Sequence, residues 1–181
     1  MKIKPIEKNL IFPFILALLG SLLMIITLFL PFSTATDDLK AEINKNPDYV
    51  FYEDVDLKAR DVVNRSMVDY ANVYSKLSNR LFASNEGNIY VGIVAAIGIF
   101  ALISLVLTLF KKAIPTIVFT LLSFLVFAFL SFDFYHRGEI PNESYNWGFG
   151  YYIFYIATIL TIIGAVWMII EKLKLKKAST H

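Results

Sequence analysis

Cysteine is absent from this 181-residue chain. Its absence excludes disulfide bonds, thiolate metal sites and cysteine nucleophiles. Charged residues are also scarce, at 18%, whereas hydrophobic residues make up 57% and the mean hydropathy is +0.60. A soluble domain of this size does not reach so apolar a composition, so the sequence predicts a membrane protein. Any part outside the membrane must be ordered by packing alone.

Four segments lack Asp, Glu, Lys, Arg and His altogether and are long enough to cross a bilayer, which takes about 20 apolar residues. They are residues 10–32, 89–110, 113–132 and 150–170. Ionisable residues inside a membrane mark proton relays, ion pathways and substrate sites. The absence of such residues argues against a proton-coupled transporter, a charged pore and an intramembrane hydrolase. The sequence therefore predicts an all-α membrane protein, a bundle of four transmembrane helices.

Basic residues are unevenly distributed around these four spans. Residues 1–9, 111–112 and 171–181 together hold nine basic and two acidic residues, whereas residues 33–88 and 133–149 hold eight basic and thirteen acidic ones. Short segments rich in Lys and Arg stay on the cytoplasmic side. We therefore expect two cytoplasmic tails joined to the spans, a cytoplasmic turn, and one long and one short extracellular loop. The tail lysines are expected to meet anionic lipid headgroups.

The first span has an alternative interpretation as a cleaved signal peptide, because Ser33–Ala35 offers small residues in a suitable spacing. Its apolar run is longer than the usual core of a signal peptide, which is 7 to 15 residues. We therefore expect it to remain as a transmembrane helix.

Small residues recur at four-residue spacing in three spans. This spacing places them on one helix face, where two backbones can approach closely. The predicted helix-packing residues are Ala17, Ser21, Gly92, Ala96, Ala157, Thr161 and Ala165. We expect them to pack within one chain, and a dimer contact is the alternative. The oligomeric state is left open.

The long loop contains a regular pattern over residues 61–82, DVVNRSMVDYANVYSKLSNRLF. Apolar residues recur at steps of four and three, which predicts an amphipathic helix over about residues 58–82 and a largely helical extracellular loop. The candidate partner-binding residues of this helix are Val63, Arg65, Met67, Tyr70, Tyr74, Leu77, Arg80 and Leu81.

Three surfaces could bury the apolar face of this predicted helix: the bundle of spans, the outer leaflet or another protein. Two acidic and three basic residues leave its polar face almost neutral, whereas helices that bind a membrane surface are strongly basic. We expect partial docking on the bundle, with the remainder available to a protein partner. Complete docking as a lid is the alternative.

The short loop places Asp133, His136 and Glu139 at three-residue spacing, which could gather metal ligands or an acid and base pair. Gly138 and Pro141 predict a turn there instead of one shared helix face. The sequence also has no phosphate-binding glycine loop, no recognisable Ser, His and Asp set and no nucleic-acid patch. We therefore expect no enzyme, no metal, no cofactor and no nucleic-acid partner.

The order of a long outer loop, a tight inner hairpin and a short outer loop resembles the claudin and peripheral-myelin-protein arrangement. This resemblance covers the whole chain as topology and no motif. Claudin first loops form a sheet and carry a Trp-rich signature and a cysteine pair, whereas this chain has no Cys and no Trp between residues 36 and 86. The stretches LFLPFS (28–33) and WGFGYYIFYIATILTIIGA (147–165) are similar to small four-span proteins of Gram-positive bacteria, which implies a bacterial plasma membrane.

These observations predict a non-enzymatic multi-pass plasma-membrane protein whose extracellular loop binds or shields a protein partner, as an accessory subunit or an immunity-type protein. An oligomeric carrier or channel for an uncharged or lipidic substrate is the alternative. Its path would be lined by the hydroxyls of Ser104, Thr108, Thr158 and Thr161.

Overall fold

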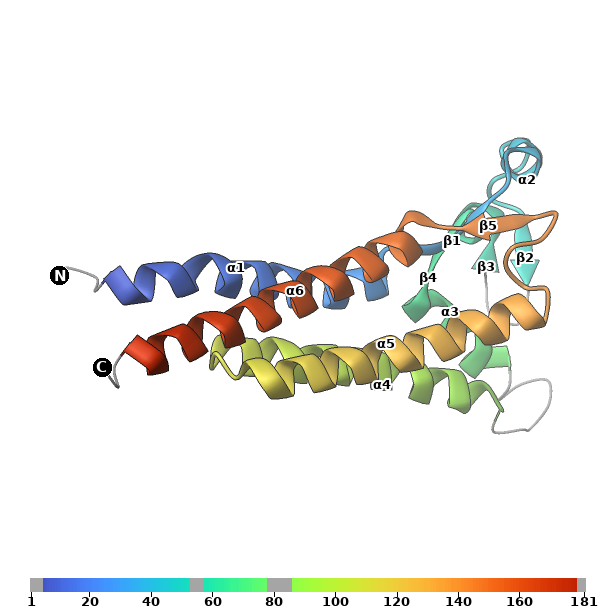
Figure 1. Ribbon diagram of the computed structural model, residues 1–181. Helices are drawn as coiled ribbons and strands as arrows, with labels where there is room; N and C mark the ends of the chain where they lie inside the picture. The colour runs from blue at the N-terminus through green and yellow to red at the C-terminus, as the bar shows by residue number, and fades with distance from the viewer. Residues whose placement is uncertain (1–4, 53–56, 78–85, 179–181) are drawn as a thin grey trace. The chain divides into compact units, whose positions relative to one another are not determined.

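The computed structural model describes residues 5–52, 57–77 and 86–178 (Figure 1). The chain divides into two compact units. We call the first the helical unit; it comprises Met1–Ile25, Ile97–Leu125 and Phe154–His181. We call the second the sheet unit; it comprises Ile26–Ala96 and Val126–Ile153.

Four long apolar helices dominate the described chain. Their bounds are Pro5–Ile26 (α1), Glu86–Leu109 (α4), Ala113–His136 (α5) and Phe149–Ala178 (α6). Each lies in or overlaps an apolar stretch of 21 to 29 residues that is long enough to cross a membrane. Many of the large apolar side chains on these stretches are exposed, as suits contact with lipid. The prediction of a mostly helical chain with four helices long and apolar enough to cross a membrane is confirmed.

In the helical unit, α1 and α6 lie side by side in direct backbone contact (Figure 1). A Cβ atom at Gly164 would meet the Ala17 backbone nitrogen and lie 2.7 Å from the Pro13 carbonyl oxygen. A Cβ atom at Gly20 would likewise lie 2.6 Å from the Thr161 backbone nitrogen. Only glycine allows two helices to approach this closely. The start of α1, the end of α6 and the α4–α5 turn lie toward one end of this unit (Figure 1).

Hydroxyl groups join α4 to α5 within the helical unit. The Ser104 and Thr120 hydroxyl oxygens are 2.7 Å apart, and Ser123 Oγ donates to the Ile97 carbonyl at 2.9 Å. The turn between the two helices comprises residues 110–112, one residue more than the predicted 111–112, and Lys111 adopts a left-handed conformation there, with φ 54°. These bonds satisfy polar groups that apolar surroundings would otherwise leave unpaired.

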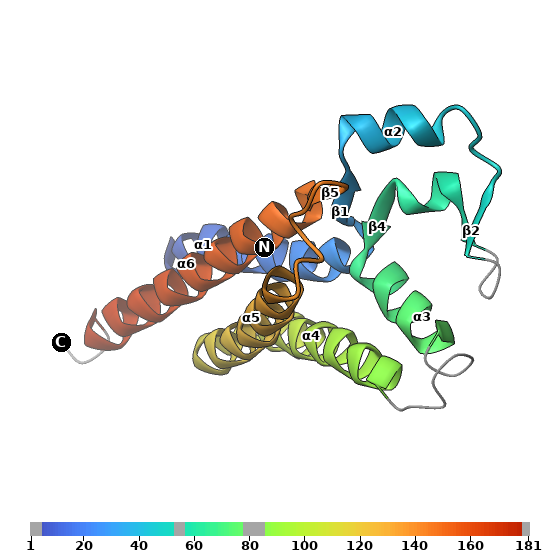
Figure 2. The same cartoon turned by 90° about the vertical axis from the view of Figure 1, so that its right-hand side faces the viewer.

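The sheet unit contains a three-stranded antiparallel sheet in which β1 (Pro31–Ala35) lies between β4 (Asn64–Ser66) and β5 (Tyr145–Trp147) (Figure 2). Ser33 of β1 is in register with Arg65 on one side and with Trp147 on the other. The remaining elements are short: η1 (Thr27–Phe29), α2 (Asp37–Ile43), β2 (Val50–Tyr52), β3 (Leu57–Lys58), η3 (Ala59–Val62) and α3 (Met67–Leu77).

The segment between the first two spans therefore differs from its prediction. It contains two short α-helices, but it also contains strands, and the described part of the predicted helix over 58–82 is divided among β3, η3, β4 and α3. Residues 31 and 32, which were expected in the first span, belong to β1.

The helix α3 begins later than the predicted start at about residue 58, and the reason lies in the contacts of Ser66. Its backbone N–H and its hydroxyl donate to Asp69 Oδ2 at 2.9 and 2.7 Å, and the Asp69 N–H is 3.1 Å from Ser66 Oγ. This reciprocal capping begins α3 at Met67. The three residues before it are held extended by pairing with β1.

An aromatic cluster forms the core of the sheet unit around Phe32, which is 1% exposed. Ring centroids 5.3 to 6.2 Å from that of Phe32 belong to Tyr70, Phe127, Phe134, Trp147 and Tyr151. All five pairs meet at steep angles, between 64° and 84°, which is the edge-to-face geometry that aromatic rings favour. The cluster joins β1, β5, α3, α5 and α6.

Candidate functional site

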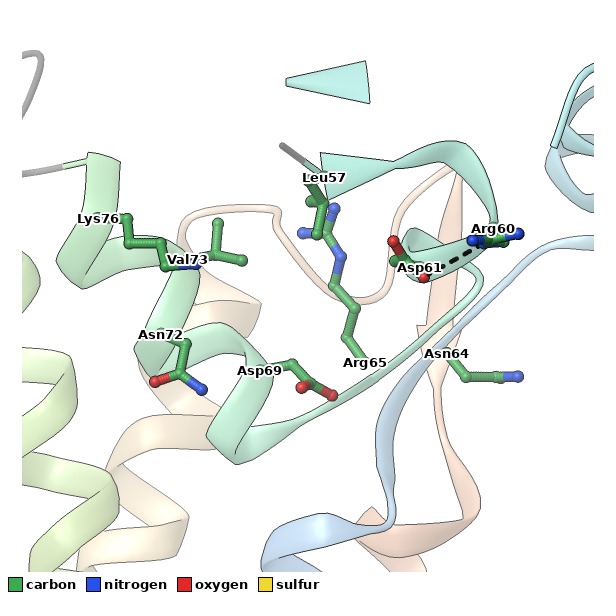
Figure 3. Close-up of a pocket in the computed structure, with 9 residues that line it drawn as sticks. All are labelled: Leu57, Arg60, Asp61, Asn64, Arg65, Asp69, Asn72, Val73 and Lys76. Carbon is green, nitrogen blue, oxygen red and sulfur yellow. Dashed lines mark ion pairs between the residues drawn. The ribbon is translucent and has the colours of Figure 1, made fainter. Parts of the chain in front are cut away.

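A polar pocket of about 530 Å³ opens in the sheet unit among β3, η3, β4 and α3 (Figure 3). Its lining residues are Leu57, Arg60, Asp61, Asn64, Arg65, Asp69, Asn72, Val73 and Lys76. Three of them are basic and two are acidic, so the lining carries a net positive charge.

Local structure explains how this pocket forms. Because α3 begins at Met67, residues 69, 72, 73 and 76 share one helical face, and that face lines the pocket. The opposite face of α3 carries the buried residues Met67 and Tyr70. Arg65 precedes the helix in β4, and Figure 3 shows its side chain extending into the pocket toward Leu57.

Arg65 is the central cation of the pocket. Its guanidinium carbon lies 5.6 Å from the ring centroid of Tyr70 and 5.7 Å from that of Tyr145, which are cation–π distances. Its Nε atom is buried and has no hydrogen-bond partner among the described residues. Because Nε is buried, a ligand in the pocket could reach the guanidinium only through its two Nη atoms.

The acidic lining residues are already engaged with their own neighbours. Asp69 accepts the two bonds from Ser66, and Asp61 Oδ2 accepts the Lys58 N–H at 3.3 Å. Arg60 Nε lies 3.9 Å from Asp61 Oδ1 (Figure 3). Arg60 Nη1 also lies 2.9 Å from Asp48 Oδ1.

Arg65 and Lys76, in contrast, form no ion pair with any described residue. The positive charge of the pocket is therefore available to an anionic group.

The remaining candidate partner-binding residues lie elsewhere. Met67 and Tyr70 are 1% and 7% exposed and face the core of the sheet unit, and the Tyr74 ring stacks on Tyr90 at 4.5 Å. Val63 packs against the buried cluster of Ile43, Ala59 and Val62. The apolar stripe thus packs largely against the protein's own sheet unit. The Leu77 side chain, Arg80 and Leu81 lie outside the described residues.

Tyr70 makes the most buried polar contact of this stripe. Its hydroxyl lies 2.8 Å from Ser33 Oγ. Burial raises the pKa of Tyr70 to about 12, although the Ser33 hydrogen bond and the charge of Arg65 act in the opposite direction. Burial also raises the pKa of Tyr74.

The predicted helix-packing residues fall into two groups. Ala17, Ala157, Thr161 and Ala165 are buried in the helical unit, and Ser21 there donates to the Ala17 carbonyl at 2.8 Å. Gly92 is exposed, and a Cβ atom placed on it would meet no described atom within 4 Å; Ala96 is half-buried. Gly20 and Gly164, which the four-residue spacing missed, make the closest approaches between α1 and α6.

Asp133, His136 and Glu139 do not converge on a common site. Asp133 Oδ2 lies 2.9 Å from Arg137 Nη2 and accepts the Tyr90 hydroxyl at 2.9 Å. Glu139 lies 3.9 Å from Arg137, and His136 is exposed and stacks on Phe132. In the described ranges, no three His, Asp or Glu side chains are placed to hold a metal ion.

The Arg65 pocket is therefore the candidate functional site. An anionic oxygen in the pocket would meet the charges of Arg65 and Lys76, and the Asn72 amide offers a further donor and acceptor. Comparisons with protein-family models, with curated proteins and with solved structures find no match to this chain.

Proposed function

We propose that this chain is a non-enzymatic multi-pass plasma-membrane protein that binds an acidic segment of a protein partner in the Arg65 pocket. The observation that carries the proposal is the net positive lining of this pocket, in which Arg65 and Lys76 form no ion pair with any described residue. A carboxylate accepts two parallel bonds from a guanidinium and would pair with the charge of Arg65. Tyr70 and Tyr145 hold the guanidinium in place beforehand, which reduces the entropic cost of binding.

The other lining groups favour a peptide segment over an isolated anion. The Asn72 amide can accept from a peptide N–H and donate to a peptide carbonyl, and Lys76 adds a second cation. The distribution of Lys and Arg around the spans supports an outer location for the pocket in a bacterial plasma membrane. An accessory subunit or an immunity-type protein would use the pocket in this way.

A carrier or channel has less support. Its expected path depended on hydroxyls that bond within the helical unit: Thr158 Oγ1 donates to the Phe154 carbonyl at 2.9 Å and Thr161 Oγ1 to the Ala157 carbonyl at 2.8 Å. Ser104 and Thr108 are likewise buried and hydrogen-bonded. These hydroxyls are engaged in holding the helices, and no observation favours them as a substrate path.

The test is position-specific photo-crosslinking in the native membrane. A photo-crosslinker replaces Asn72, which lines the pocket, and captured proteins are compared between the unmodified chain and Arg65→Gln. Because a hydrogen-bonded charge contributes about 1.5 to 3 kcal/mol, we expect capture to fall roughly tenfold or more. The matched control is Lys40→Gln, which removes the same charge from the exposed Lys40–Asp37 pair in α2 and should leave capture unchanged.

Two results would contradict the proposal. The first is equal capture by Arg65→Gln when its membrane level and thermal unfolding match those of the unmodified chain. The second is capture of the same protein, with equal yield, from a photo-crosslinker at Lys45, which is exposed and lies outside the pocket lining.

A further inference from the structure

A second cleft, of about 470 Å³, lies in the helical unit between the α4–α5 turn and the last turns of α6. Lys111 and Lys112 contribute from the turn, and Lys172 and Lys176 contribute from α6. The rest of the lining is apolar, and none of the lining residues, which are all described, is acidic. Four lysines are therefore gathered around an apolar surface.

The two walls of this cleft are joined to each other. The Lys172 ammonium donates to the Lys111 carbonyl, and the Lys111 side chain lies over the Phe14 ring with Nζ 5.7 Å from its centroid. Ile114 and Leu173, one from each wall, are 67% and 56% exposed. The cleft thus combines a positively charged rim with exposed apolar side chains.

We propose that this cleft binds the phosphate-bearing headgroup of an anionic phospholipid, with the acyl chains along the exposed apolar side chains of α5 and α6. The position of the cleft supports this proposal. The apolar stretch of α4 ends at Leu109 and that of α5 begins at Ala113, so the turn between them lies just outside both stretches. Basic pockets between transmembrane helices at this depth recognise lipid headgroups. The inference is independent of the Arg65 pocket and needs only that the helices cross a membrane.

The experiment uses the full chain, purified in neutral detergent and titrated with lipid in native mass spectrometry. The three probes are phosphatidylglycerol, phosphatidylcholine and inorganic phosphate. The cleft variant is Lys112→Gln with Lys176→Gln, and the control is Lys174→Gln with Lys177→Gln, which removes the same charge from lysines outside the cleft lining.

We expect phosphatidylglycerol to bind more tightly than phosphatidylcholine, and its affinity to fall about tenfold in the cleft variant and less than about twofold in the control. Equal binding of the two lipids would overturn the proposal, and so would an equal loss in the control, which would indicate a diffuse charge effect. Displacement of phosphatidylglycerol by an equal concentration of inorganic phosphate would also overturn it, because a soluble anion would then be the ligand.

Discussion

Different kinds of side chain form the internal contacts of the two units of this molecule. In the helical unit, helices meet through glycine and alanine, and buried hydroxyls bond across the contact, as Ser104 does with Thr120. In the sheet unit, the core consists of large aromatic rings around Phe32. The sheet unit also carries most of the charged residues of the chain.

This difference follows from what each unit gains by packing. Lipid tails are as apolar as leucine side chains, so helices in a bilayer associate through close backbone contact and hydrogen bonds. In the sheet unit, large aromatic rings bury the most surface per residue and gain from edge-to-face contacts. The aromatic cluster also holds Tyr70, which positions the Arg65 guanidinium, so the core of the sheet unit supports the pocket directly.

The largest effect is expected for Phe32→Ala, which removes the centre of the aromatic cluster. Burial and cavity effects together predict a loss of about 3 to 5 kcal/mol in the free energy of unfolding. The matched control is Phe29→Ala, because Phe29 is 66% exposed and only three residues away. Denaturant unfolding can be followed by Trp147 fluorescence in a Trp167→Phe background, since the Trp147 ring lies 5.3 Å from that of Phe32. Equal losses for the two variants would refute the central role of Phe32.

The apolar spans could be predicted from the sequence because an uncharged apolar run is a property of neighbouring residues. A run of about 20 residues without a charge has few other structures available to it. Phe32 shows the opposite case: it follows directly on an apolar run and was therefore assigned to the first span. Its ring partners Tyr70 and Tyr151 lie far away in the sequence, and only the folded chain brings them together.

Part of the Arg65 pocket could be predicted from the sequence. The apolar spacing correctly indicated an amphipathic helix with Met67, Tyr70 and Tyr74 on one side, and Ser66 followed by Asp69 was a capping signal for a start at Met67. What the sequence could not provide was the pairing of β4 with β1, which depends on residues about 30 positions apart. That pairing places Arg65 in the pocket.

Alanine in place of glycine is expected to change the free energy of unfolding by a smaller amount, and in opposite directions at Gly164 and Gly92. At Gly164 the added Cβ meets backbone atoms of α1, which cannot move aside as a flexible side chain does, so we expect a loss of about 1 to 3 kcal/mol. At Gly92 the Cβ has open space, and alanine favours a helix over glycine by up to about 1 kcal/mol. Thermal unfolding in detergent should therefore show a lower Tm for Gly164→Ala and an equal or higher Tm for Gly92→Ala.

If Gly164→Ala and Gly92→Ala changed the Tm equally, close backbone contact would not be what holds α1 against α6. Gly20→Ala provides a second test of the same contact from the other helix, since its Cβ would approach the Thr161 backbone.

The smallest effect concerns the pH dependence of the sheet unit, through Tyr70. Its pKa is about 12 in the folded chain, against 10.0 for an ordinary tyrosine, because burial disfavours the phenolate. The folded state therefore holds this proton more tightly than the unfolded state, so the stabilisation is complete below pH 10 and is lost as pH rises toward 12. These two pKa values correspond to a loss of about 1.4 kcal/mol by pH 11.

Comparison with Tyr70→Phe isolates this effect, because the other tyrosines titrate in both proteins. The variant lacks the hydroxyl that lies 2.8 Å from Ser33 Oγ and should be less stable at pH 8. Its deficit in unfolding free energy should then shrink by about 1.4 kcal/mol between pH 8 and pH 11, since only the unmodified chain loses the contribution of this proton. A deficit that stays constant over this range would show that Tyr70 is hydrated, and the aromatic core of the sheet unit would then not exclude water as its burial implies.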